Sequence, residues 1–394
     1  MKIYEIGTGY TPIPARMGAA TEIVVEELTR AFLKQGAQVE IIDIAASDRA
    51  PHQLPIREVR VPKCFAGTDV QLGIMHKLKR VVYSVSLART LQKILKQSDE
   101  KVLLHFHNQY NLFFFLKLTP KKLREKGVIA YTNHSGIWRL NWCEIEDTIR
   151  KRYFQEAECM KRADLAFLLN EETKRNVMEH LGVPEKRMVV INNGVNTDVY
   201  HPLPEDEKRR AKRKWNLEGQ KVILQVGSVY ENKGQLRSAE YLLPLLKADP
   251  KLVFAYAGGV VDEDYQQKIR AFAEEHGLAE QIRYLGMLSP GTELNELYNT
   301  AAATMLPSKY ESFGLVVIES FSSGVPVLLN RNGPFHFGEG SITFEHGDFS
   351  GAVNRKVFGD TEEYQQLCDQ ARKNAMENYS WDKIARDYRG AWEK

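Results

Sequence analysis

Two stretches of the chain open with the same pattern of apolar and polar positions. Residues 2–7 and 221–227 each form a short, β-branched apolar run that ends at a glycine. Residues 21–34 and 235–246 follow them, with apolar side chains at the three- and four-residue spacing of an amphipathic helix. Another apolar run comes after each helix. The pattern therefore predicts two β-α-β units, which belong to parallel sheets.

Further apolar runs predict strands that alternate with helices along most of the chain. They lie at residues 38–44, 102–105, 128–131, 165–169, 188–191, 252–257, 281–284, 303–306 and 325–329. The 394 residues are too many for one hydrophobic core. We therefore expect an α/β protein with two Rossmann-like, doubly wound parallel sheets that face a central cleft.

A charge-dense stretch at residues 205–214, preceded by Pro202 and Pro204, is interpreted as the connection between the two sheets. It divides the chain into an N-terminal domain at 1–198 and a C-terminal domain at 199–375. Composition agrees with a compact protein, since 27% of the residues are charged and 43% hydrophobic.

The longest apolar stretch, residues 102–118, is interrupted by polar side chains, so no membrane span is expected. Glu5 lies where a signal peptide needs an apolar core, which makes the cytoplasm the expected location. The four cysteines have no C-x-x-C spacing, and we expect buried, reduced thiols rather than a zinc site or disulfides.

Positive charge is concentrated in one segment of the first half. Between Lys77 and Lys126 there are twelve Lys and Arg residues against three acids. An anionic membrane surface, such as the inner face of the cell membrane, would attract this segment, and so would an acidic acceptor molecule. An ordinary solvated basic face is the alternative. No nucleic-acid-binding motif accompanies the charges.

The strongest candidate for chemistry is the segment 307–319, which follows a predicted strand and opens a predicted helix. Glu311 and Glu319 stand eight residues apart, and Phe313, Gly314 and Leu315 present backbone N–H groups at the helix start. Carboxylates accept hydrogen bonds from paired hydroxyls, so the arrangement suits a sugar attached to a diphosphate. Alternatively, Glu311 complements the helix dipole and Glu319 is a surface charge.

Two further loops are candidates for phosphate binding. Residues 227–234 bend back after a strand and place Lys233 before a helix; the order K-G differs from the G-K-[ST] of a nucleotide-hydrolysing P-loop. Gly18 and Ala19 allow close backbone approach in the loop before the first helix. Pro12 occupies the third-glycine position of a dinucleotide fingerprint, which disfavours NAD.

Three histidines and one acidic cluster complete the candidates. His134 follows a strand at its carboxyl end, where functional loops gather. His105 and His107 share one face of a strand and could form a metal pair, but no third ligand has recognisable spacing, so roles in the core or crevice are favoured. The acids at 262–264 are interpreted as a helix cap rather than a metal-binding D-x-D motif.

Taken in order, these motifs resemble the family-4 retaining glycosyltransferases of GT-B architecture, over nearly the whole chain. The resemblance also rests on the segments 132–134, 193–198, 283–286, 323–327 and 381–388. It implies an acceptor in the N-terminal domain, a nucleotide-diphospho-sugar in the C-terminal domain, and a last helix, residues 376–394, that crosses back to the N-terminal domain. The acceptor would be a sugar, a glycolipid or an acidic glycan.

The same resemblance implies roles for individual residues. Glu311 would bind donor-sugar hydroxyls, Glu319 the ribose, and Lys233 the diphosphate; His134 would position the donor sugar. The backbone from Phe313 to Leu315 would face sugar and phosphate, and Gly18 and Ala19 would approach the diphosphate. The acceptor would attack on the face that the leaving phosphate departs from, with no metal and no other cofactor.

One departure concerns the phosphate loop, where the family often has Arg and this chain has Ser228. Arg237 and Arg331 are candidates to replace that cation. Because of Ser228, a second function stays open, that of a nucleotide-sugar-binding protein with little turnover. A GT-B sugar epimerase is a further alternative. UDP is favoured over GDP, while the sugar, the acceptor, the linkage and the oligomeric state stay open.

Overall fold

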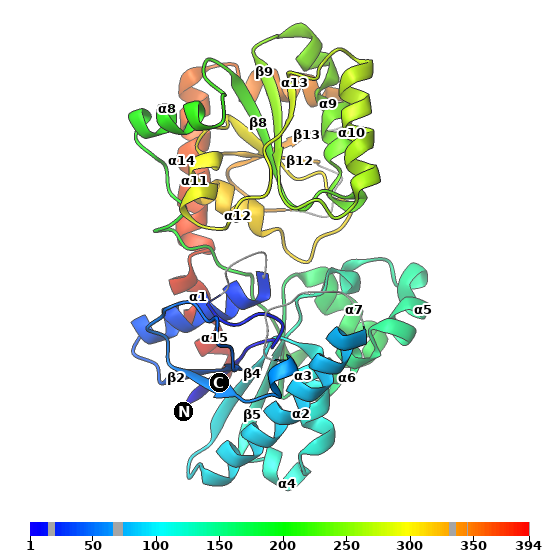
Figure 1. The fold of residues 1–394 in the computed structure, drawn as a ribbon, viewed down its shortest axis with the longest axis vertical. Coiled ribbons are helices and arrows are strands. Elements are labelled where there is room, and N and C mark those ends of the chain that lie inside the picture. Colours follow the sequence, from blue (N-terminus) through cyan, green and yellow to red (C-terminus); the bar gives the residue numbers. More distant parts are fainter. Residues whose placement is uncertain (15–19, 66–73, 331–335, 345, 394) are drawn as a thin grey trace. The chain divides into compact units, whose positions relative to one another are not determined.

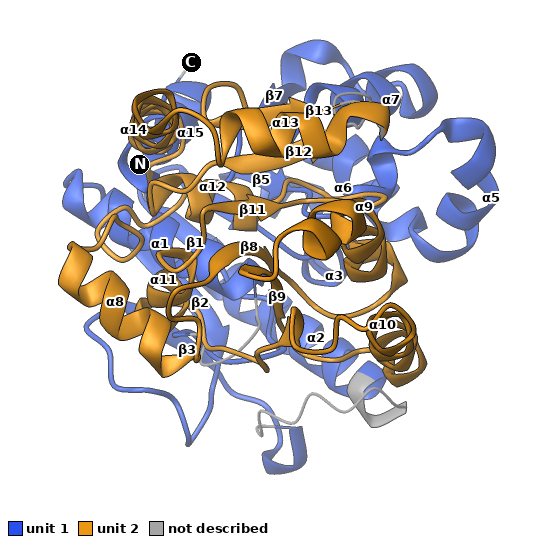
Figure 2. Ribbon diagram, turned by 90° about the horizontal axis from the view of Figure 1, so that it is seen from above, with its two compact units in different colours: residues 1–194, 381–394 blue, residues 195–380 orange. Residues whose placement is uncertain are grey.

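The computed structural model describes residues 1–14, 20–65, 74–330, 336–344 and 346–393, which divide into two compact units (Figures 1 and 2). Unit 1 comprises Met1–Gly194 and Trp381–Lys394, and unit 2 comprises Val195–Ser380. The chain thus leaves unit 1 four residues before the boundary expected at 198, and it returns at Trp381.

Unit 1 contains a parallel sheet of seven strands in the order β3-β2-β1-β4-β5-β6-β7. The strands are β1 (Ile3–Ile6), β2 (Val39–Ile44), β3 (Ile56–Val59), β4 (Val102–Phe106), β5 (Gly127–Thr132), β6 (Leu165–Leu168) and β7 (Met188–Val190). The direction of strand order reverses between β1 and β4. In open parallel sheets, ligands bind beyond the carboxyl ends of the strands at such a switch point.

Helices cover both faces of this sheet (Figure 1). They are α1 (Ala20–Lys34), α2 (Ile74–Gln97), α3 (Gln109–Leu118), α4 (Lys121–Arg124), α5 (Trp142–Arg152), α6 (Phe154–Arg162), α7 (Glu171–Leu181) and α15 (Trp381–Trp392). Alternate residues of β1 and β4 point to opposite faces: Ile3 and Leu103 pack with α1 and α15, whereas Tyr4 and Leu104 pack with α2 and α3. The C-terminal helix is thereby part of the first core.

Unit 2 repeats the same plan with six parallel strands in the order β10-β9-β8-β11-β12-β13, and its switch point lies between β8 and β11. The strands are β8 (Lys221–Val226), β9 (Leu252–Ala257), β10 (Ile282–Tyr284), β11 (Ala303–Met305), β12 (Val327–Asn330) and β13 (Ser341–Phe344). The helices are α8 (Glu205–Lys214), α9 (Gln235–Ala248), α10 (Glu263–Glu275), α11 (Thr292–Tyr298), α12 (Leu315–Ser322), α13 (Phe349–Lys356) and α14 (Thr361–Asn378).

The expectation of two Rossmann-like parallel-sheet domains is confirmed. The acids at 262–264 do cap a helix, because the Asp262 carboxylate accepts a hydrogen bond from the backbone N–H of Tyr265 at 3.0 Å. Among the described residues, no helix has the length and apolar character needed to span a membrane.

Two expectations need correction, and two strands were missed. The charge-dense stretch 205–214 is the helix α8, whose acidic first turn and basic last turn complement the helix dipole. The edge strands β3 and β13 were not predicted, because they are short and only partly buried. Cys64 and Cys143 are exposed, whereas Cys159 is buried.

Candidate functional site

In unit 2, two loops at the switch point are joined by one buried side chain. The Asn232 side chain follows β8; it donates to the carbonyl of Tyr310 at 3.0 Å and accepts from the Tyr310 N–H at 3.2 Å. The Asn232 carbonyl also accepts from the Lys309 N–H at 2.9 Å. These bonds hold the loop after β8 against the loop after β11. Asn232 was not among the residues predicted from the sequence.

This contact brings together Lys233 and Glu311, which were predicted separately. The Lys233 ammonium forms an ion pair with Glu311 Oε1, and the same oxygen accepts from the Ser308 hydroxyl at 2.8 Å. The two side chains are 22% and 13% exposed, so the pair is reachable from solvent but largely shielded. A cation and a carboxylate at this position can bind phosphate oxygens and sugar hydroxyls respectively.

The start of α12 lies on the same segment as Glu311. Gly314 precedes the helix with φ of 102°, and a Cβ there would lie 3.3 Å from side-chain atoms of Leu306 and Phe337. Phe313 is buried and its ring packs 5.6 Å from that of Phe337. Leu315 is the first residue of the helix. The glycine is therefore required by the backbone conformation and by the close approach of neighbours.

Glu319 lies one helical turn further and is not the exposed charge of the alternative interpretation. Its carboxyl accepts a hydrogen bond from the Tyr298 hydroxyl at 2.8 Å. Burial raises the pKa of Glu319 to about 7, although hydrogen bonds from Tyr298 and Tyr200 oppose the shift. Near neutral pH this side chain can therefore either donate or accept a hydrogen bond.

The remaining phosphate-binding candidates are less clearly placed. Ser228 follows β8 and is partly buried, and its carbonyl accepts from the Gln235 side chain at 3.0 Å. The guanidinium of Arg237 donates to the carbonyl of Pro307 at 2.6 Å and so lies beside the Glu311 loop. Three candidates, Gly18, Ala19 and Arg331, lie outside the residues that the structure describes.

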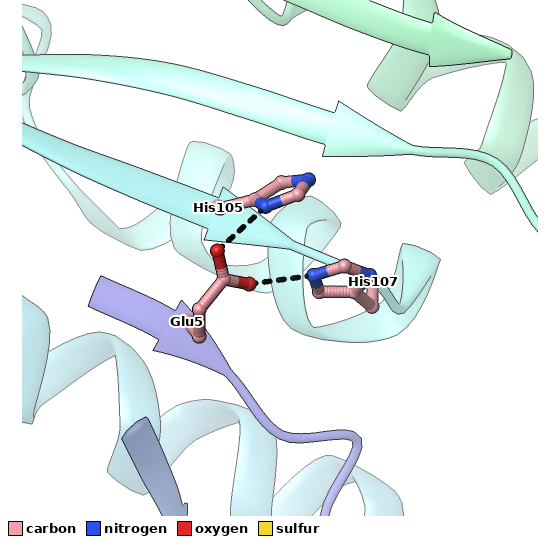
Figure 3. A group of neighbouring side chains, drawn as sticks. All are labelled: Glu5, His105 and His107. Atoms are coloured by element: carbon pink, nitrogen blue, oxygen red, sulfur yellow. Dashed lines mark hydrogen bonds and ion pairs between the residues drawn. The ribbon is translucent and has the colours of Figure 1, made fainter. Parts of the chain in front are cut away.

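In unit 1, a row of polar side chains crosses the switch point between β1 and β4 (Figure 3). Glu5 and His105 are paired in the parallel register, and His107 follows two residues later on the same face. One carboxylate oxygen of Glu5 lies 2.9 Å from His105 Nδ1 and the other lies 2.8 Å from His107 Nε2. All three side chains are buried.

His134 extends this row toward a cavity. Its Nε2 lies 3.0 Å from His107 Nδ1. His107 and His134 line a cavity of 280 Å³, together with Tyr10, Arg80 and Glu156. The guanidinium of Arg80 lies 4.5 Å from the ring centre of Tyr10, a cation–π contact. The cavity thus offers imidazole and hydroxyl hydrogen-bonding groups, aromatic faces, the Arg80 cation and the carboxyl groups of Glu22 and Glu156.

Burial and hydrogen bonding shift the pKa values in this row. Burial would raise the pKa of Glu5, but His105 and His107 outweigh it and hold the pKa at about 2. For His107, burial and the neighbouring His105 lower the pKa to about 4. Burial, with smaller contributions from His107 and His105, also places the pKa of His134 well below its ordinary value. At neutral pH, Glu5 is therefore ionised, and both His107 and His134 are neutral.

Glu5 is the third potential metal ligand beside His105 and His107, and it was not identified from the sequence. The three offer ligand atoms within 4.8 Å of one another, as a metal site requires. The contacts they make are direct hydrogen bonds between the carboxylate and the two imidazoles. The sequence signal was present: a buried parallel strand is normally apolar on both faces, and the charged Glu5 in β1 departs from that rule.

Comparisons with known proteins cover both units. Residues 21–199 match the family model described as Glycosyltransferase Family 4, and residues 207–336 match the one described as Glycosyl transferases group 1. An uncharacterized glycosyltransferase of Methanocaldococcus jannaschii is 28% identical over 233 residues, which cover 56% of this chain and 57% of that protein. The match thus spans little more than half the length of this relative.

Two other similar proteins align over nearly the whole chain. The mannosylfructose-phosphate synthase of Agrobacterium fabrum is 22% identical over 410 residues, covering 96% of this chain and 87% of the relative. The solved structure of Anabaena HepE in complex with UDP and glucose has a TM-score of 0.71 and 15% identity, covering 100% of both chains. At that identity, the structural likeness shows a shared fold.

Proposed function

Since the chain belongs to the family-4-type glycosyltransferases of GT-B architecture, we propose that it is a retaining glycosyltransferase. It moves a sugar from a nucleotide-diphospho-sugar, with a UDP-sugar favoured, to a glycan, glycolipid or small-molecule acceptor. The proposal rests above all on the Lys233–Glu311 pair at the switch point of unit 2.

The pair accounts for binding of the donor. Phosphate oxygens compete with the Glu311 carboxylate for the Lys233 ammonium, and the carboxylate is then free to accept hydrogen bonds from sugar hydroxyls. The backbone N–H groups at the start of α12, after Gly314, favour negative charge. Glu319, whose pKa of about 7 lets it act as donor or acceptor, binds the ribose hydroxyls.

The reaction needs no covalent intermediate with the protein. The acceptor oxygen forms a bond to the anomeric carbon of the sugar while the bond from that carbon to the diphosphate oxygen breaks. The proton of the acceptor hydroxyl passes to the leaving phosphate, and attack on the same face retains the configuration. Lys233 stabilises the negative charge that grows on the leaving diphosphate, so no divalent metal is required.

Relatives support parts of this assignment. The name of the Agrobacterium relative, mannosylfructose-phosphate synthase, supports a sugar-phosphate acceptor, and the UDP and glucose bound to HepE support a UDP-sugar donor. The cavity of unit 1 supports a hydroxyl-bearing acceptor, since its Tyr and His side chains supply hydrogen bonds for hydroxyls; Arg80 adds a cation, and the carboxyl groups of Glu22 and Glu156 also line it.

Ligand-induced stabilisation tests the donor assignment. A thermal-shift panel of UDP, GDP and ADP and their sugars should raise the melting temperature with UDP-linked ligands, because a ligand that binds only the folded state stabilises it by mass action. The shift should persist in EDTA. Equal, small shifts for all nucleotides, or none, would remove the donor assignment.

A further inference from the structure

The row formed by Glu5, His107 and His134 has a defined hydrogen-bond direction. An ionised carboxylate has no proton to give, so His107 must donate to Glu5 through Nε2–H. Because His107 is neutral, its Nδ1 then carries a lone pair, and the proton between the two histidines belongs to His134 Nε2. A neutral His134 consequently keeps its Nδ1 unprotonated.

The unprotonated nitrogen is available to a ligand. His134 lines the cavity of 280 Å³, and within the described part of the chain no hydrogen bond to its Nδ1 occurs. A hydroxyl placed there would therefore meet an acceptor. A histidine without the Glu5–His107 support would be free to present either a donor or an acceptor.

We propose that Glu5 is a positioning residue that acts through His107 to fix the tautomer of His134, whose Nδ1 accepts a hydrogen bond from a substrate hydroxyl. This inference rests on the proposed function, because the hydroxyl belongs to the sugar substrate. Glu5 itself does not line the cavity. It lies under α15, where the Tyr388 ring is 5.2 Å from the imidazole of His105.

The tautomer can be measured directly in the wild-type full chain. Nitrogen-15 NMR of the imidazole rings at neutral pH, with the His134 signals assigned from their loss in His134→Gln, should show a proton on Nε2 and none on Nδ1. A proton on His134 Nδ1, or an imidazolium, overturns the proposal. So does a stoichiometric metal in the purified protein that is lost in Glu5→Leu, since a metal would occupy the lone pairs.

A variant pair separates positioning from packing. Glu5→Leu removes the acceptor that the described residues provide for His107 Nε2–H, which favours the opposite tautomers of His107 and His134, because a buried N–H without a partner is costly. Thr132→Val is the matched control: it removes the contact to His105 Nε2 at 2.7 Å, which is not one of the contacts that link Glu5, His107 and His134. We expect kcat/KM to fall about tenfold or more in Glu5→Leu and to stay within about twofold in Thr132→Val.

Different results would contradict the proposed function and the positioning role of Glu5. If the wild type transfers sugar but Glu5→Leu keeps the wild-type His134 tautomer and kcat/KM, the positioning role is wrong and the proposed function stands. If the wild type transfers no sugar, the proposed function fails, and the NMR measurement still decides the tautomer. Should Glu5→Leu not fold, the wild-type spectrum alone carries the test.

Discussion

Lys233 and Glu311 form an ion pair although 78 residues separate them in the chain. Asn232 fixes the relative position of their loops through two hydrogen bonds to the backbone of Tyr310. The pair therefore follows from the way the loops after β8 and β11 are joined, and it places a cation and an anion at the switch point of unit 2.

The first prediction is that Lys233→Ala weakens UDP binding by about tenfold to a hundredfold, the range for losing one charge-assisted hydrogen bond. Isothermal titration calorimetry measures it. Lys309→Ala is the control, because Lys309 pairs with Glu231 across the same two loops but both side chains are exposed. Equal losses in the two variants would mean that loop structure, and not a contact to phosphate, is responsible.

A second prediction concerns Gly314. We expect Gly314→Ala to lower the free energy of unfolding by about 1–3 kcal/mol and to reduce UDP binding, because the new methyl group meets Leu306 and Phe337 at φ of 102°. Chemical denaturation and calorimetry measure the two effects. In Gly277→Ala, φ is also positive, at 67°, but no atom lies within 4 Å of the added carbon.

The Gly277→Ala control separates the effect of backbone strain from that of the contacts made by the added methyl group. Gly277→Ala should cost about 1 kcal/mol and leave UDP binding unchanged, because it adds backbone strain alone. If Gly314→Ala behaves in the same way, the start of α12 is not part of the donor site.

The raised pKa of Glu319 predicts that the stability of the protein depends on pH. Its pKa is raised from 4.5 to about 7 in the folded state, so between these values the folded protein holds a proton that the unfolded chain has lost. The contribution of Glu319 to the free energy of unfolding therefore falls as pH rises from about 4.5 to about 7, by on the order of 3 kcal/mol.

Urea unfolding of the wild type and of Glu319→Gln, at about pH 5 and about pH 7.5, tests this dependence. The stability of the wild type relative to the variant should be lower at the higher pH. A difference between the two proteins that is the same at both pH values would contradict the raised pKa.

The basic segment predicts a salt-sensitive interaction. Lys96, Lys121 and Lys122 are exposed near the ends of α2 and α4, which contact each other. If the segment binds anionic membranes, replacing all three lysines by Gln should reduce flotation with anionic vesicles at low salt, since each cation contributes about 1 kcal/mol to membrane binding.

The control replaces three exposed cations elsewhere in unit 1, namely Lys151, Arg152 and Lys161. Flotation that is unaffected by the first set, or reduced equally by both sets, would contradict a docking role for the basic segment.

Much of the fold could be predicted from the sequence because parallel strands and their helices carry strong periodic signals. The two β-α-β openings predicted the first strands and helices of both sheets, whereas the strand order and the switch points come from the structure. The edge strands β3 and β13 did not, since short strands with exposed positions resemble loops. The last helix was placed through its resemblance to a family; in the structure, the helix from Trp381 packs on α1 and is part of unit 1.

The candidate site was predictable residue by residue but not as a set of contacts. Lys233 and Glu311 stood out in their own loops, yet their meeting depends on contacts between the loops, such as the Asn232 hydrogen bonds, that the sequence does not show. Glu5 was read as a residue that argues against a signal peptide. Its pairing with His105 depends on the register between β1 and β4, which local sequence does not specify.

The transfer reaction itself shows whether the chain is a retaining glycosyltransferase. UDP-glucose carrying a carbon-13 label in the sugar is incubated with the wild type and a mixture of sugar, sugar-phosphate and glycolipid acceptors, and products are analysed by mass spectrometry and NMR. We predict a labelled product with the α configuration of the donor, and its loss in folded Glu311→Gln, Lys233→Ala and His134→Ala. A product of inverted configuration, or full activity in all three variants, would contradict the account.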